Sequence, residues 1–289
     1  MIVGTHVDQI LASASAVKPF PKVAQQALSL LDDPMVSAGK LSDVISLDAG
    51  VTAAVLKAAN SAAFARARRV DDLKQALGLL GNSRFRELVF ASASAPFLAA
   101  SQPGYHLTEG NLWRHSVATS LLAEQLARQA KLEVAGGLLF TAGLLHDIGK
   151  SVLNQYVEAA AVEIQRVVKE QGKTFLEAEL QVLGVHHAEL GARLAERWNF
   201  SPALVELIRF HHEPHLRPES KPLAALHLAA VVSELTFVTG GVDAFAQKGD
   251  ERCVKLLGLH RKDLEAAVAE VHFKLAQAEA LLAMAPAKN

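Results

Sequence analysis

Hydrophobic side chains recur every three to four positions along almost the whole chain, which is the spacing of an amphipathic α-helix. Runs of β-branched residues are few, and no Asn-Gly or Asp-Gly pair offers a hairpin turn. The pattern therefore predicts an all-α protein.

Prolines and helix-capping residues divide the first hundred residues into short helices. Pro21 can occupy the first position of a helix, where its missing N–H costs nothing. Asp71 and Asn82 are suited to cap two further helices, and Gly81 between them ends the first. The helices expected here cover about residues 21–31, 41–47, 51–64, 72–80 and 82–95.

A Pro-Gly pair at 103–104 marks the expected seam between two modules, after which helical periodicity resumes. Thr174 and Glu177 have the spacing of a capping box, and Ser201 followed by Pro202 combines an N-cap with a first-turn proline. The helices expected beyond the seam cover about residues 108–130, 136–148, 155–171, 175–183, 187–198, 202–212, 221–238 and 260–284.

Composition indicates a soluble globular chain. It has 289 residues, of which 51% are hydrophobic and 20% charged, so it can bury a sizeable core in one or two modules. Charged and amide side chains interrupt each apolar run before it reaches the roughly 20 residues that span a bilayer. The first residues show neither a basic leader nor an apolar segment with a cleavage site. We therefore expect a cytoplasmic protein with no membrane partner.

Charge and cysteine content exclude other classes of function. The net charge of −1 gives no overall attraction for a polyanion, so nucleic acid is not an expected partner. The densest basic cluster, Arg66, Arg68 and Arg69, more often solvates a turn than binds phosphate. Cys253 is the only cysteine, which excludes an internal disulfide and a thiolate zinc site, and we expect it to be a small core residue.

A His-Asp pair stands at the end of a strongly apolar helix. His146 and Asp147 follow the run AGLL and precede Gly149, so an imidazole and a carboxylate emerge together where helices converge. Burying that carboxylate alone would be costly. A divalent cation would offset the cost, because it binds ionised carboxylates and neutral imidazoles.

Further histidines occur in similar surroundings. His211 and His212 follow ALVELIRF at a helix end, the place where neighbours that diverge by about 100° can reach one ion. His115 lies inside an apolar helix, and His187 follows His186 at a helix start. Together these residues suffice for one or two metal ions. Each histidine alone is more often a hydrogen-bonded core residue, so a structural cluster without metal is the alternative.

Lys150, just after the His-Asp pair, has two interpretations. Its ammonium can meet a phosphate oxygen at the centre, or it can be a solvated lysine at a helix end, where it favourably meets the helix dipole. The remaining histidines lack a comparable context and are expected to be surface or packing residues: His6, His106, His215, His227, His260 and His272.

The segments WRHS, LLHDIGK, GVHHAELGARLAERW and IRFHH together resemble the HD superfamily of metal-dependent phosphohydrolases. Upstream, KPFPKVAQQALSLLDDP, LSDVISLDAGVTAAVLKAANSAAF and LGNSRFRELVF resemble the N-terminal helical module of HDOD signalling proteins, so the resemblance covers about residues 7–240. It implies a multi-helix bundle with an HDOD module at 1–103, an HD-type module at 104–240, and C-terminal helices at 241–289 packing on the bundle.

The resemblance also implies a metal site. Asp147 would bridge a first metal to a second one, and His186 would be the substitute if His187 is not a ligand. The implied ligands are His115, His146, Asp147, His187, His211 and His212. Imidazole and carboxylate ligands suit iron, manganese, nickel or zinc, and the similarity to binuclear HD proteins makes iron the first expectation for one or two divalent ions.

One position departs from the family pattern. HD enzymes normally add a late aspartate, and Ala230 stands at the matching place. This departure would leave one site weak, water-filled, or completed by His227 or Glu234.

Two functions fit these residues. The first is a bacterial signal-transduction protein with a largely retained HD metal site, which regulates by binding a signalling protein or a nucleotide-like ligand. The second is an active phosphohydrolase or phosphodiesterase acting on a nucleotide or cyclic (di)nucleotide, in which Asp147 orients a metal-bound water and Lys150 stabilises charge. The missing aspartate favours the first, and a purely structural helical protein is a third alternative.

Overall fold

The protein is described by a computed structural model that defines residues 3–31, 33, 35–60, 70–133, 137–237 and 249–282. Every regular element in these ranges is a helix, and one isolated β-bridge joins Gln102 to Leu107. The all-α prediction is confirmed. Among the described helices, none combines the length and apolar character needed to cross a membrane.

Helices follow one another with short connections. In the first half of the described chain they are α1 (Val3–Ala16), α2 (Lys22–Leu31), α3 (Ala38–Ile45), α4 (Ala49–Ala59) and α5 (Leu73–Leu98). The second half begins with η2 (Pro103–Tyr105), α6 (Asn111–Gln129), α7 (Leu138–Leu145), α8 (Lys150–Ala159), α9 (Ala161–Gln171) and α10 (Phe175–Leu183). It continues with α11 (His187–Arg197), α12 (Pro202–Phe210), η3 (Pro214–Leu216), α13 (Lys221–Thr236), α14 (Glu251–Leu257) and α15 (Arg261–Leu282).

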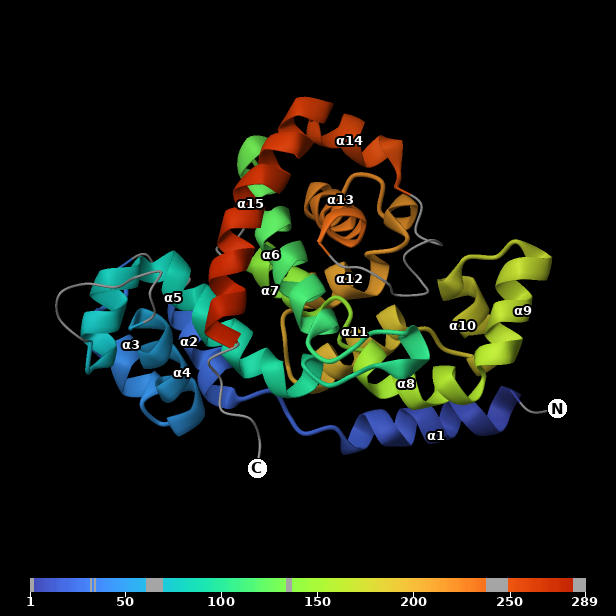
Figure 1. Ribbon diagram of the computed structural model, residues 1–289, viewed down its shortest axis with the longest axis horizontal. Coiled ribbons are helices and arrows are strands. Elements are labelled where there is room, and N and C mark those ends of the chain that lie inside the picture. The colour runs from blue at the N-terminus through green and yellow to red at the C-terminus, as the bar shows by residue number, and fades with distance from the viewer. Residues whose placement is uncertain are drawn as a thin grey trace.

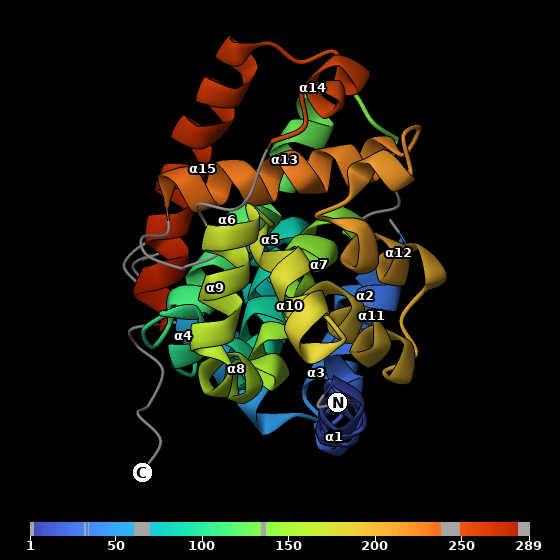
Figure 2. The same ribbon diagram turned by 90° about the vertical axis from the view of Figure 1, so that its right-hand side faces the viewer.

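Helices α2 to α5 form a group at one side of the molecule, and the later helices form a larger bundle beside it (Figure 1). Within the bundle α6 is central, because α7, α13 and α15 all pack on it. The first helix does not stay with its neighbours in sequence: α1 runs along the larger bundle and packs on α8, α10 and α11. Figure 2 shows α13 lying across the top of the bundle, with α14 above it, on the side away from most other helices of the bundle.

Several predicted boundaries are confirmed. Thr174 and Glu177 form the capping box of α10, which spans the residues expected, and Ser201 caps α12 with Pro202 in its first turn. At Gly81 the backbone leaves helical geometry (φ 73°, ψ 165°), so the expected break is present as a kink inside α5.

Other details of the prediction are wrong. The cap of α5 is Asp72 and not Asp71, because the Asp72 side chain accepts the backbone N–H of Gln75 at 2.8 Å. The single helix expected at 155–171 is two helices, and the first of them, α8, already begins at Lys150. Neither α1 nor α14 was expected. The final part of the helix expected at 51–64, from residue 61 on, lies outside the described residues.

An aromatic cluster joins the two groups of helices. Phe20, before α2, is 1% exposed, and its ring lies 5.8 Å from that of Phe90 on α5. On its other side it lies 5.7 Å from Trp198 and 5.6 Å from Phe200, both in the connection between α11 and α12. Because α11 and α12 also carry candidate ligands, this shared core fixes the smaller group of helices against the elements that position the site.

Candidate metal centre

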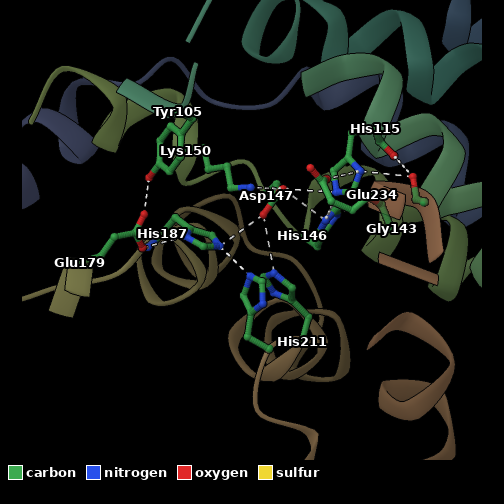
Figure 3. Close-up of polar contacts among 12 residues, drawn as sticks. Tyr105, His115, Gly143, His146, Asp147, Lys150, Glu179, His187, His211 and Glu234 are labelled. Atoms are coloured by element: carbon green, nitrogen blue, oxygen red, sulfur yellow. Dashed lines mark hydrogen bonds and ion pairs between the residues drawn. The ribbon is translucent and has the colours of Figure 1, made fainter. Parts of the chain in front are cut away.

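Six side chains from α6, α11 and the segments after α7 and α12 converge in the larger bundle, as Figure 3 shows for those that it labels. Their nitrogen and carboxylate atoms form two overlapping groups, in each of which one atom per residue lies within 4.8 Å of the others. The converging side chains are those of His115, His146, Asp147, His187, His211 and His212. The structure thus brings together the full set that the sequence predicted as ligands.

Asp147 belongs to both groups. Its Oδ2 lies 3.5 Å from Nε2 of His115 and 3.4 Å from Nε2 of His146. Its Oδ1 lies 3.4 Å from Nε2 of His187 and 3.6 Å from Nε2 of His211. The carboxylate therefore stands between two sets of imidazole nitrogens, with one oxygen turned to each.

The turn between α7 and α8 presents the His-Asp pair. The first of these helices ends at Leu145, so His146 and Asp147 leave it at its last turn. A Cβ atom at Gly149 would collide with the backbone carbonyl of His187. Glycine therefore lets the turn lie directly against the start of α11, which brings Asp147 beside His187.

Backbone carbonyls fix the protonated nitrogen of two rings. Nδ1 of His146 lies 2.7 Å from the carbonyl oxygen of Gly143, and Nδ1 of His211 lies 2.7 Å from that of Ile208. A carbonyl can only accept, so Nδ1 donates and Nε2 of the neutral ring keeps its lone pair. Both lone pairs therefore face Asp147.

Carboxylates have the same effect on two other rings. Nδ1 of His187 lies 2.8 Å from Oε2 of Glu179, and Nδ1 of His115 lies 3.2 Å from Oε2 of Glu234. Carboxylate partners behind an imidazole are typical of histidines that bind metal through the other nitrogen. The arrangement of all four rings thus directs Nε2 inward.

The inward-facing nitrogens approach one another closely. Nε2 of His115 lies 3.1 Å from Nε2 of His146, and Nε2 of His187 lies 2.9 Å from Nε2 of His212. Two nitrogens that both carry lone pairs repel each other at such distances unless a proton or a cation is shared between them. The donor set therefore fits a bound cation.

Buried atoms without hydrogen bonds support the same conclusion. Oδ1 of Asp147 and Nε2 of His211 are buried and have no hydrogen-bond partner among the described residues. Leaving such groups unsatisfied costs free energy. A divalent ion would bind both atoms, so the residues present fit the group that the family resemblance implies.

Burial and neighbouring charges set the protonation states. Burial holds the pKa of His146 and of His212 well below the ordinary 6.5 and also lowers the pKa of His211. Burial opposes ionisation of Asp147, but the groups around the carboxyl, among them the Lys150 ammonium at 2.7 Å, outweigh this effect and hold its pKa well below its usual range. Neutral imidazoles beside an ionised carboxylate are the forms that bind a metal.

Lys150 is part of the centre and not a solvated lysine. Its side chain is 2% exposed, and Nζ lies 2.7 Å from Oδ2 of Asp147. It is also the first residue of α8, at the helix end where the dipole disfavours a cation. The interpretation of Lys150 as a solvated residue favoured by the dipole is therefore wrong.

The groups suggested as replacements for the late aspartate face elsewhere. Ala230 is buried on α13, and Glu234, one turn later, contacts the Nδ1 side of His115. His227 donates from Nδ1 to the carbonyl of His211 at 2.8 Å, and its Nε2 accepts the backbone N–H of Asp250 at 3.2 Å. Glu234 thus contacts the outward nitrogen of His115, and His227 binds the backbone of His211, so both act on candidate ligands and not on the centre itself.

The substitute proposed for His187 has another role. His186 caps α11, because its Nδ1 accepts the backbone N–H of Glu189 at 3.2 Å, and burial lowers its pKa to about 4. Cys253 is buried as expected. The side chain of His6 and the cluster Arg66, Arg68 and Arg69 lie outside the described residues. The other histidines without a predicted role are exposed or, for His227, packed: His106, His215, His227, His260 and His272.

The sequence did not single out Tyr105 and Glu179, which complete the surroundings of the centre. Both are fully buried, and the Tyr105 hydroxyl donates to Oε1 of Glu179 at 2.6 Å. Burial disfavours a charge on His187, but Glu179 outweighs this effect and raises the pKa of His187 above 6.5. The available signal was a glutamate at a buried position of an amphipathic helix, between Ala178 and Leu183 on the same face.

Comparison with known proteins shows the family to which the chain belongs. Residues 17–214 match the HDOD domain family. An uncharacterized protein of Treponema pallidum (strain Nichols) is 26% identical over 224 residues, which is 76% of this chain and 43% of that protein. The chain therefore spans less than half the length of this curated relative.

Solved structures show the same fold. An HDOD domain protein of unknown function from Geobacter sulfurreducens aligns with a TM-score of 0.72 at 23% identity, over 96% of both chains. A protein from Shewanella amazonensis, provisionally named a phosphohydrolase, gives 0.68 at 24% identity, over 96% of this chain and 98% of its own. A protein from Marinobacter aquaeolei, provisionally named a signal transduction protein, gives 0.67 at 21%, over 98% of this chain and 67% of its own.

Proposed function

Since this chain belongs to the HDOD family, we propose that it is a signal-transduction protein whose metal centre controls the binding of a protein partner or of a nucleotide-like ligand. The ligands in this proposal are the six side chains that converge on Asp147, and one or two divalent ions would be held there. The name of the fold neighbour from Marinobacter aquaeolei agrees with a signalling role.

The observation that carries the metal centre is the orientation of four imidazole rings. In His146 and His211 the Nδ1 side meets a backbone carbonyl, and in His187 it meets the Glu179 carboxylate. In His115 it meets the Glu234 carboxylate and the Ser233 hydroxyl. In all four rings the Nε2 side faces Asp147. A purely structural histidine cluster would satisfy both nitrogens with ordinary partners, since unsatisfied buried nitrogens are costly. A cation at the centre gives the inward nitrogens their partner.

Burial favours regulation over catalysis. Asp147 and His146 are 0% exposed, and His187 and His211 are 1% exposed. A phosphorylated substrate must reach the metal and an open coordination position to be hydrolysed. A centre whose ligands are so little exposed is better suited to fixing the positions of the surrounding helices than to admitting a substrate. A partner can then recognise the positions of these helices.

The choice of metal follows from the donor atoms. Imidazole nitrogen with carboxylate oxygen suits iron, manganese, nickel and zinc, and the six donors include no thiolate. Iron is our first assignment by resemblance to binuclear HD proteins. When bound, the ion would supply a partner for Oδ1 of Asp147 and Nε2 of His211, which have no hydrogen-bond partner among the described residues.

Phosphohydrolase activity is the second candidate, and Lys150 is the observation that favours it. Its buried ammonium beside Asp147 could neutralise a phosphate oxygen. His212 is less buried than the other ligands, so a substrate would approach the centre from the side of His212. A protein with a similar fold from Shewanella amazonensis is provisionally named a phosphohydrolase.

The division of the chain into three parts belongs to the proposal. We assign residues 1–103 to the HDOD module, 104–240 to the HD-type module and 241–289 to the C-terminal helices. The short helix η2 at 103–105 and the separate group formed by α2 to α5 support the first boundary. The packing of α1 on α8, α10 and α11 indicates that the first helix ties the two modules together.

A paired experiment tests the proposal. Metal-loaded and metal-stripped protein are compared by hydrogen–deuterium exchange, and the loaded protein is assayed against cyclic nucleotides, cyclic dinucleotides, nucleoside phosphates and a generic phosphodiester, with Asp147→Ala as control. We expect metal to slow exchange in α7, α11 and α12 and no turnover to depend on Asp147. Turnover that disappears in Asp147→Ala would favour the enzyme, and exchange that metal does not change would contradict the regulatory role.

A further inference from the structure

We infer that Tyr105, in the turn between the two modules, is a positioning residue for the His187 half of the centre and acts through Glu179. This inference rests on the proposed metal-binding function. It assigns to a residue far from the ligands in sequence the task of orienting one of them.

Glu179 holds His187 by two contacts. Its Oε2 accepts the backbone N–H of His187 at 3.0 Å and the Nδ1–H of the ring at 2.8 Å. One carboxylate oxygen therefore fixes both the position and the rotation of the imidazole, whose Nε2 lies 3.4 Å from Oδ1 of Asp147. Figure 3 shows this line of residues on one side of the centre.

Tyr105 in turn holds Glu179. Its hydroxyl donates to Oε1 at 2.6 Å, so each oxygen of the carboxylate has its own donors. Without the hydroxyl, Oε1 would lose a buried hydrogen bond, and the carboxylate could rotate away from His187 to find another donor. The hydroxyl thus restrains the ring of His187 through one intermediate residue.

The Tyr105 ring also contacts Lys150, the second group that flanks Asp147 on this side (Figure 3). Nζ of Lys150 lies 5.4 Å from the ring centroid, within the range of a cation–π contact, and the same ammonium lies 2.7 Å from Oδ2 of Asp147. Tyr105 therefore acts on both groups that flank Asp147. It reaches His187 through Glu179 and by a T-shaped contact between the two rings, whose centroids lie 6.3 Å apart, and it contacts Lys150 with its ring face.

The turn that carries Tyr105 is fixed to α8. The backbone N–H of Gly104 donates to Oδ1 of Asn154 at 2.8 Å, and a Cβ atom at Gly104 would lie 2.8 Å from the backbone nitrogen of Glu158. Only glycine permits this close approach. The module junction, α8 and the His187 half of the centre are thus linked by direct contacts.

The test compares the two tyrosines of the chain. Tyr105→Phe removes the hydroxyl but keeps the ring under Lys150, and Tyr156→Phe is the matched control, because its hydroxyl contacts Ser13 and lies outside the centre. The first measurement uses metal-free protein and follows the Nδ1–H proton of His187 by ¹⁵N-edited NMR. We expect its exchange with water to become at least about tenfold faster in Tyr105→Phe and to stay unchanged in Tyr156→Phe.

The second measurement is a titration with Mn²⁺. Loss of an outer hydrogen-bond partner typically weakens metal binding about 10- to 100-fold. We expect Tyr105→Phe to weaken Mn²⁺ binding by about tenfold or more and to add nothing in a His187→Ala background, because both changes then act on the same ligand. Glu179→Gln, which keeps an oxygen acceptor for His187, should retain more affinity than Glu179→Ala.

The outcomes separate the inference from the proposed function. Unchanged exchange of the His187 proton in Tyr105→Phe, or an equal loss of Mn²⁺ affinity with and without His187, overturns the positioning role. If the wild-type protein binds no metal ion, the proposed function fails, whereas the exchange measurement still decides whether Tyr105 orients His187.

Discussion

At the scale of single residues, the centre depends on side chains whose protonation is set by burial. A histidine in water divides its population between charged and neutral forms near pH 6.5. Burial shifts His146, His211 and His212 toward the neutral form, while Asp147 stays ionised beside Lys150. The folded chain thus prepares ligand groups before any ion arrives.

The first prediction concerns stability against pH. Burial lowers the pKa values of His146, His211 and His212 in the folded protein. Below pH 6.5 these side chains therefore bind protons in the unfolded chain but stay neutral in the folded one. The contribution of these three histidines to the stability of the metal-free protein is therefore complete well above pH 6.5. It falls as the pH drops through 6.5 toward 5, by about 1.4 kcal/mol per pH unit for each proton that the folded state does not take up. His187 has a raised pKa, so the folded state binds its proton more readily than the unfolded state does, and this one group changes stability in the opposite direction.

Urea unfolding in the presence of a chelator at pH 7.5, 6.5 and 5.5 measures this dependence. We expect the unfolding free energy to be clearly lower at pH 5.5 than at pH 6.5 and 7.5. A constant or rising value would show that the buried imidazoles take up protons in the folded state.

The second prediction concerns Cys253. Burial raises the pKa of its thiol to about 11, and the side chain is 4% exposed. At pH 8 the thiolate fraction is then about a hundredfold lower than for a thiol with a pKa of 9, so native protein should react slowly with a disulfide reagent. Complete reaction is expected in guanidinium. Rapid reaction of the native protein would place Cys253 in an accessible site.

At the scale of secondary structure, helix α13 supports the centre from outside. His227 and Glu234 are seven residues apart on it and contact the backbone of His211 and the ring of His115. Ala230 lies three residues after the first and four before the second, so it belongs to the same face. By the resemblance to HD enzymes, this is the face on which the late aspartate is expected.

The third prediction follows from that position. Ala230→Asp should tighten metal binding at the His115 and His146 side by at least about tenfold, because it adds a carboxylate where one ligand is missing. The metal-free variant should be less stable than wild type, since the added charge is buried without a partner. Mn²⁺ titration and urea unfolding measure both effects, with Ala230→Asn as the uncharged control. Equal affinity in the Asp and Asn variants would contradict the assignment.

The elements differ in how far the sequence specifies them. Local capping residues determine the starts of α10 and α12, so both could be predicted. Helix α14 is only seven residues long, and such a helix forms through packing, here on α13, which a local pattern does not reveal. Helix α8 was predicted to start too late, because the His-Asp turn that precedes it is held by contacts with α11.

The residues of the site also differ in how far the sequence specifies them. The convergence of the six side chains could be predicted, because His-Asp and His-His pairs at apolar helix ends are costly unless they share a function. Tyr105 and Glu179 are separated by 74 residues, and neither stands out from its neighbours. Their pairing is created by the docking of η2 on α8, so only the folded chain shows it.

At the scale of the whole molecule, the two groups of helices share a core. Phe20 inserts between Phe90 of α5 and the segment with Trp198 and Phe200. The backbone carbonyl of Trp198 also accepts a hydrogen bond from the Gln25 side chain of α2 at 3.0 Å. The smaller group of helices is thus joined to the connection between α11 and α12, which carry candidate ligands.

The fourth prediction tests this junction. Phe20→Ala should lower the unfolding free energy by about 3–5 kcal/mol, because the side chain is 1% exposed and its removal leaves a cavity. Phe273→Ala, at a side chain that is 73% exposed, is the matched control and should stay within about 0.5 kcal/mol of wild type. Equal effects of both substitutions in urea unfolding would contradict a shared core.

The metal centre itself is tested most directly by anomalous diffraction from crystals of the metal-loaded protein, with data collected on both sides of the absorption edge of the metal. We expect a peak within about 2.0–2.2 Å of Nε2 of His146 and of an oxygen of Asp147, and a second peak on the His187 side if two ions bind. Well-ordered crystals in which the six side chains converge as described, but in which no anomalous peak lies among them, would contradict the proposed metal centre.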